Sequence, residues 1–277
     1  MVSTSSSIML LSHQPLTFRR ADLCNATLTR SNPQFNLLPE FKANRNLLIN
    51  APFTSRTPSP AFRPSSTSCG CDKTLSKIIS SLCSLSNIVS NEQNPKLLIV
   101  DKIYLIERQV VILLADSHSP SCSPVNQAAF IACLIYIYIF LRDFPLRSPL
   151  FGNLVERLAA TLFDDAEEER VHVEWTEDRY QMLLWVLVIG ALVSEGSCER
   201  DRFVVELKRV CGVQGVDGFE DFEKELQNSA WLERKALDSP VRATPFLRTL
   251  WNEVQLVGVG QEIDVAMMGM MDLVGGL

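Results

Sequence analysis

Two long apolar runs limit the folds open to this chain more than any other feature. Residues 128–141 read AAFIACLIYIYIFL and residues 182–193 read MLLWVLVIGALV, without a charged side chain in either. As a helix, the longer run would span roughly 21 Å, short of the roughly 30 Å hydrocarbon core of a bilayer. Charged residues adjoin both runs, Arg142 and Asp143 after the first and residues 177–179 before the second. We therefore expect two central helices of a helical bundle and no membrane span.

Helical periodicity continues on both sides of these runs, with proline and glycine residues between the segments. Asn126, Thr176 and Thr244 stand where N-cap side chains are expected. The pattern predicts an irregular all-α, multi-helix bundle, although residues 97–115 could also form a strand. The expected helices cover about 74–89, 97–115, 126–143, 150–163, 176–193, 199–211, 217–237 and 244–254.

The chain divides into three parts by composition. Residues 1–73 are rich in Ser, Pro and Arg and poor in acidic groups, which predicts a disordered tail and is also compatible with an organellar transit peptide. Residues 74–257 form the expected helical domain, and residues 258–277 are a weakly structured Gly- and Met-rich end. Residues 1–71 hold seven basic and two acidic side chains, and the remainder holds 19 basic and 30 acidic ones. An acidic body argues against a general electrostatic grip on nucleic acid.

Side chains suited to chemistry are sparse and scattered. His13 and His118 lie in the tail and in a Ser/Pro loop, and His172 follows an acidic run that is expected to be a solvated face. The eight cysteines are irregularly spaced, and the close pair Cys69 and Cys71 lacks metal-site spacing. No nucleophile elbow, phosphate-binding loop or zinc-binding helix motif is present. We therefore expect no catalytic, cofactor-binding or metal-binding residues, and no enzyme.

Four segments resemble the regulatory domain of the fungal-specific transcription factors that carry a binuclear zinc cluster. An apolar I-Y-x-Y segment at 135–142 precedes Ser148-Pro149, and LLW-x-x-x-x-G occupies 183–190. E-R-x-x-F-V follows at 199–204, and FLRTLWNE at 246–253, after Trp231, is similar to the family's closing region. The resemblance covers about residues 120–254. It implies a helical module that represses activity, senses partners or small molecules, and makes dimer contacts.

The family's DNA-binding part has no counterpart here. It holds two zinc ions with six cysteines that begin C-x2-C-x6-C, and the spacing of Cys69 and Cys71 does not match. Direct DNA binding is therefore doubtful, and the family contributes no catalytic or cofactor-binding residues. The chain is expected to be either a stand-alone relative or a sequence that lacks an upstream zinc-cluster exon.

These features predict transcription regulation in the nucleus, or alternatively a mitochondrial location. The expected partners are proteins of the transcription machinery or a second copy of the chain, with a small-molecule effector as an option. One alternative is an all-α enzyme or binding protein for an apolar small molecule. Another is an organellar membrane-associated protein, suggested by the apolar runs and the Arg- and Ser-containing tail.

Overall fold

The computed structural model describes residues 21–29, 31, 33, 70–89, 96–115, 123–163, 179–227 and 243–257. All regular elements in these segments are helices, and no strand occurs within them, so the predicted all-α fold is confirmed. Residues 97–115, where strand was the alternative, belong to the helix α4 (Lys96–Ala115).

Helix α5 (Pro124–Tyr136) is the centre of the bundle. It begins two residues before the expected position 126, because Ser123 is the N-cap and its hydroxyl accepts a hydrogen bond from the Asn126 amide at 3.3 Å. The prediction that Asn126 is the cap is wrong, since Pro124 needs no N–H partner and fits the first helical position. Asn126 is instead buried in the first turn.

The end of α5 widens into the π-helical turn η3 (Ile137–Leu141). The chain then turns at Asp143, whose φ of 51° is in the left-handed region, and the Phe144 amide donates to the Tyr138 carbonyl at 2.9 Å. Pro149 is the first residue of the next helix, α6 (Pro149–Leu162), and Ser148 is the N-cap of that helix.

The second central helix is α8 (Tyr180–Val193), which packs against α5. Trp185 and Tyr136 are fully buried, and their ring centroids lie 6.1 Å apart. Both apolar runs are therefore core helices, as predicted. Thr176, the expected cap of α8, lies outside the described residues.

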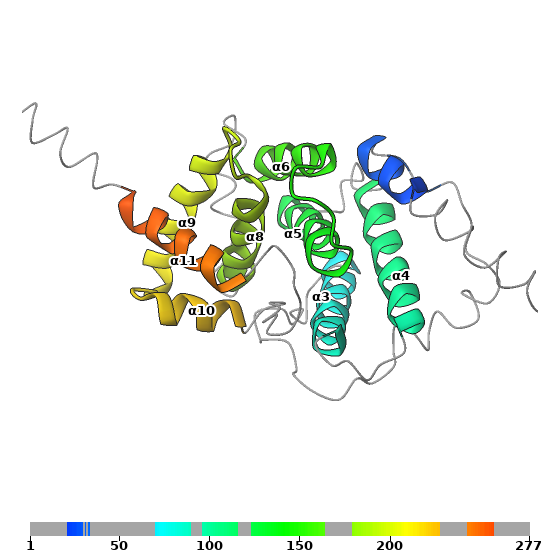
Figure 1. Ribbon diagram of the computed structural model, residues 1–277, viewed down its shortest axis with the longest axis horizontal. Helices are drawn as coiled ribbons and strands as arrows, with labels where there is room; N and C mark the ends of the chain where they lie inside the picture. The colour runs from blue at the N-terminus through cyan, green and yellow to red at the C-terminus, as the bar shows by residue number, and fades with distance from the viewer. Residues whose placement is uncertain are drawn as a thin grey trace, which may run out of the picture.

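The other helices surround this pair on two sides (Figure 1). Helix α3 (Gly70–Val89) and α4 contact α5, and α6 lies across both central helices. On the other side, α9 (Arg200–Gln214) and α10 (Phe219–Gln227) pack on α8, and α11 (Ala243–Leu256) packs on α9 and α10. Helix α9 is followed by its C-cap Gly215, whose φ of +65° suits a residue without a Cβ. Helix α11 begins at Ala243, so Thr244 lies inside the helix and the prediction that Thr244 is its N-cap is wrong.

Residues 21–29 are an exception to the disorder expected for residues 1–73. They form a helix whose Leu23 and Ala26 are buried and belong to the same core as α5 and α8. Leu23 and Ala26 are three residues apart and therefore lie on the same helical face, which gives this short segment an apolar surface to bury. Helix α3 also begins at Gly70, slightly before the predicted domain boundary.

Candidate functional site

The structure brings no histidine into a site, because His13, His118 and His172 all lie outside the described residues. Within the described part of the chain, no group of three His, Cys, Asp or Glu side chains is placed to hold a metal ion. The cysteines described there, Cys24, Cys83, Cys133, Cys198 and Cys211, are free thiols. The polar side chains that do converge form two clusters, one at each end of the bundle.

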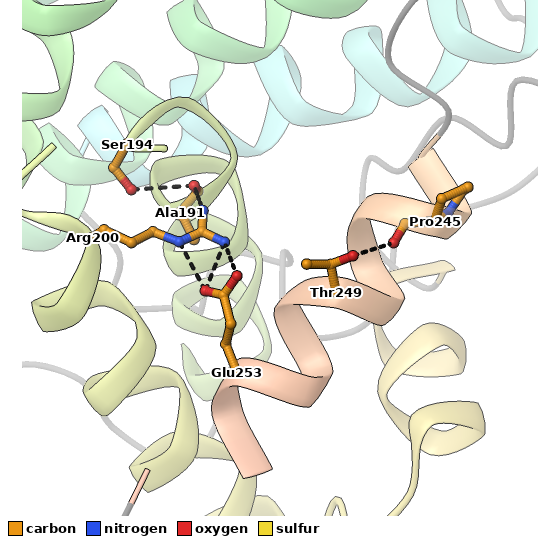
Figure 2. A network of polar contacts seen from close by, with 6 residues as sticks. All are labelled: Ala191, Ser194, Arg200, Pro245, Thr249 and Glu253. Carbon is orange, nitrogen blue, oxygen red and sulfur yellow. Dashed lines mark hydrogen bonds and ion pairs between the residues drawn. The ribbon is translucent and has the colours of Figure 1, made fainter. Parts of the chain in front are cut away.

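The first cluster centres on Arg200, at the start of α9 (Figure 2). Its guanidinium makes a bidentate ion pair with Glu253 of α11, with Nε to Oε2 at 3.0 Å and a second nitrogen to Oε1 at 3.1 Å. The same group donates to the Ala191 carbonyl in the last turn of α8, where Ser194 Oγ also donates at 3.1 Å. Positive charge is favourable at that helix end. Arg200 therefore connects three helices through one side chain.

An aromatic ring completes the surroundings of Arg200. The guanidinium carbon lies 5.7 Å from the centroid of the Phe246 ring, which belongs to α11. The Arg200 side chain is 13% exposed, whereas that of Glu253 is 38% exposed. The bidentate contact between the Arg200 guanidinium and the Glu253 carboxylate fixes the orientation of both side chains, and so holds α9 and α11 in register. Each of the three guanidinium nitrogens donates to Glu253 or to the Ala191 carbonyl, so the side chain joins α8, α9 and α11.

Beside Arg200, helices α8 and α9 approach each other closely. A Cβ added to Gly190 would lie 2.4 Å from Cε1 of Phe203, which is too near for any side chain. The Phe203 ring also makes an edge contact with Phe163, with centroids 5.2 Å apart. Gly190 is thus required because the Phe203 ring occupies the space above it.

Helix α11 rests on α9 and α10 through a single apolar stripe. Leu247, Leu250, Trp251 and Val254 are buried, and the Trp251 ring lies 5.1 Å from that of Phe222 in α10. After the last turn of α11, Lys208 of α9 donates a hydrogen bond from Nζ to the carbonyl of Val257. The contact between α11 and its neighbours therefore combines an apolar stripe with two cations from α9, Arg200 and Lys208.

The second cluster is a buried ion pair at the opposite end of the bundle. Arg142, just after η3, donates to Glu107 of α4 at 2.7 Å, and each side chain is only 2% exposed. Burial, followed by the negative charge of Glu107, raises the pKa of the Tyr138 hydroxyl well above its ordinary value. Tyr138 in η3 and Arg142 just after it both interact with Glu107.

Residues 21–29 are attached to this second cluster by hydrogen bonds. The Thr27 hydroxyl donates to the Leu23 carbonyl at 2.8 Å and lies 3.3 Å from the Tyr138 hydroxyl. Arg157 of α6 donates to the Thr27 carbonyl at 3.2 Å. The N-terminal helix is therefore held both by its apolar face and by a buried polar contact.

Burial shifts the pKa of several other groups. It lowers the pKa of the Lys102 ammonium in α4 to about 8 and raises the pKa of the Cys211 thiol to about 12. Burial also raises the pKa of Cys133, with a smaller contribution from Cys83. Raised thiol pKa values keep these cysteines protonated and unreactive at neutral pH.

Sequence reasoning did not identify either cluster. Arg142 was interpreted as a flanking charge of the apolar run and Glu107 as an interruption of another, although isolated charges among apolar residues must find a partner when they are buried. That signal indicates that Glu107 and Arg142 need partners, but it does not identify them. Arg200 and Glu253 are 53 residues apart, and no local pattern links them.

The apolar core also bears on the question of a membrane. In the described segments, the stretch Pro124–Leu141 is long and apolar enough to cross a bilayer by composition alone, and 83% of it is buried inside the bundle. A core helix has the same composition, so this stretch is weak evidence for a membrane span.

No family model matches this chain, and neither a curated protein nor a solved structure matches it.

Proposed function

We propose that this chain is a helical regulatory module of the kind found in fungal transcription factors, and that it acts through protein contacts. The observation that carries the proposal is the meeting of three separate segments on which the resemblance depends. Gly190 ends LLW-x-x-x-x-G, Arg200 lies in E-R-x-x-F-V, and Glu253 ends FLRTLWNE.

The contacts between these segments use the residues that define them. Phe203 of the second segment occupies the space above Gly190 of the first. Arg200 of the second binds Glu253 and lies beside Phe246, both in the third. On this basis we propose a fold plan shared with the regulatory domains and a nuclear role in transcription regulation. Contact with transcription proteins or with a second copy fits a module whose polar side chains position helices.

A reporter assay in fungal cells tests this proposal. The full chain is fused to an unrelated DNA-binding domain, and the reporter is expected to change severalfold relative to the DNA-binding domain alone. The variant R200Q should abolish that change, because it removes the ion pair with Glu253. R209Q is the matched control, since Arg209 is a more exposed arginine of the same helix and its ion pair, with Glu206 at 2.6 Å, joins two residues of α9.

Location provides an independent test. A fluorescent fusion of the full chain is expected to accumulate in the nucleus. Accumulation in mitochondria in a carbonate-resistant membrane fraction, together with an unchanged reporter, would contradict the proposal and favour the organellar alternative.

A further inference from the structure

Ser148 lies in a solvent-facing turn, directly before a proline. The turn joins η3 to α6, and residues 143–149 alternate between exposed and half-buried positions, with Arg147 and Pro149 among the exposed ones. Ser148 itself is half-buried, and its hydroxyl accepts a long hydrogen bond from the Leu150 amide at 3.4 Å. The Ser148 hydroxyl is therefore held weakly in a segment that other proteins can reach.

The backbone at Ser148 has the conformation in which protein kinases bind their substrates. The ring of a proline clashes with a helical conformation of the residue before it, which restricts that residue to extended conformations. Ser148 accordingly has a φ of −66° and a ψ of 137°. Protein kinases bind the segment around the acceptor hydroxyl in an extended form, and proline-directed kinases require a proline directly after it. Ser148 meets both requirements without a change in its own dihedral angles.

Dipeptides of this kind are frequent in the chain. Seven of its 14 prolines directly follow a serine or a threonine, although these two residue types supply only 38 of the 277 residues. In the described part of the chain, both side chains are placed for Ser123-Pro124 and Ser148-Pro149. Residues 116–122, which a kinase would bind ahead of Ser123, lie outside the described residues, so the argument from structure applies to Ser148.

We propose that Ser148 is a phosphorylation site for a proline-directed protein kinase that uses ATP. Oγ of Ser148 forms a bond to the γ-phosphorus of ATP, while the bond from that phosphorus to the β,γ-bridging oxygen breaks and ADP leaves. The hydroxyl proton passes to the catalytic carboxylate of the kinase. This inference does not depend on a role in transcription.

A phosphate on Ser148 strengthens the start of α6. It brings a charge of about −1.5 to −2 and three strong acceptor oxygens to the N-terminal end of the helix, where negative charge is favourable. The Leu150 amide, which has a neutral acceptor at 3.4 Å in the unmodified chain, gains a charged one, and Arg147 is the neighbouring residue. Phosphorylation is therefore expected to stabilise the fold.

The purified full chain is treated with a mitogen-activated protein kinase and ATP, and the phosphate at each site is measured by mass spectrometry. Ser148 should be phosphorylated in the folded wild-type chain, and S148T should accept phosphate at the same position. The variant P149A keeps the hydroxyl but lacks the proline, so its phosphorylation at Ser148 should fall at least tenfold. Ser59, which also precedes a proline, is the internal reference that P149A leaves unchanged.

Thermal unfolding is the second measurement. Kinase treatment should raise the unfolding midpoint of the wild-type chain by about 1–4 °C more than that of S148A, which accepts phosphate at the other sites alone. Failure of the folded chain to accept phosphate at Ser148, when a peptide of residues 142–153 does accept it, would overturn the proposal. Equal phosphorylation of Ser148 in the P149A and wild-type chains would also overturn it.

Discussion

Glu107 and Arg142 are tolerated in apolar surroundings because each neutralises the other at 2.7 Å. A buried ion pair is not automatically stabilising, since both groups lose hydration, but removal of one partner leaves a charge without compensation. The pair therefore acts as a specific connection between α4 and the turn after η3. The effect of burying these charges can be measured directly on the free energy of unfolding.

Replacement of Arg142 alone should be more harmful than replacement of both members of the pair. R142M is expected to lower the free energy of unfolding by about 3–5 kcal/mol, because Glu107 remains buried without its cation. The double variant E107M/R142M should recover much of that loss. Urea unfolding of the two single variants and the double variant measures the coupling. Additive effects would show that the contact contributes nothing specific.

Lys102 should make the stability of the protein depend on alkaline pH. Its pKa is lowered to about 8 in the folded chain from 10.5, so the unfolded chain binds more protons between these values. The Lys102 contribution is therefore unfavourable below pH 8 and diminishes as the pH rises from 8 to 10.5. Burial of the Cys133 and Cys211 thiols acts in the opposite direction, because their pKa values are raised.

The variant K102M separates these effects. The stability of the wild-type chain relative to K102M should increase between pH 8 and 10.5, as measured by urea midpoints at a series of pH values. A constant difference across that range would contradict a lowered Lys102 pKa.

At the scale of helices, α8 and α9 approach closely where Gly190 meets the ring of Phe203. Helix periodicity alone predicts that both helices exist, but it does not predict that a glycine on one meets a ring on the other. The same reasoning applies to the end of α5, because periodicity does not predict that Tyr138 and Arg142 both interact with Glu107 of α4.

Two glycine substitutions distinguish crowding from helix propensity. G190A should destabilise the protein by about 1–3 kcal/mol, because the new methyl group overlaps Phe203. G152A in α6, where nothing lies within 4 Å of an added Cβ, should stabilise it by up to about 1 kcal/mol. Thermal unfolding by circular dichroism measures both. Equal effects at the two positions would show that Phe203 yields without cost.

For the molecule as a whole, one hydrophobic core extends from Leu23 in the N-terminal helix to Val254 in α11. Both central helices contribute most of their side chains to it. A shared core predicts that α5 and α8 unfold together, whereas a helix at the edge, such as α11, opens more easily.

Native-state hydrogen exchange tests that expectation. The slowest amides of α5 and α8 should open with the same free energy, equal to that of global unfolding, and the amides of α11 with a lower one. Different limiting free energies for α5 and α8 would divide the bundle into two independent units.

Local patterns in the sequence were sufficient for the helical class, the two buried central helices and most helix positions, because periodicity and burial of whole runs depend on neighbouring residues. They did not determine every helix end, because α9 continues through Gly212 to Gln214, and Ser123 instead of Asn126 caps α5 ahead of Pro124. Tertiary structure alone decided which partners Arg142, Arg200 and residues 21–29 would find. Those contacts join residues 35, 53 and more than 100 positions apart, and the packing of whole helices determines them.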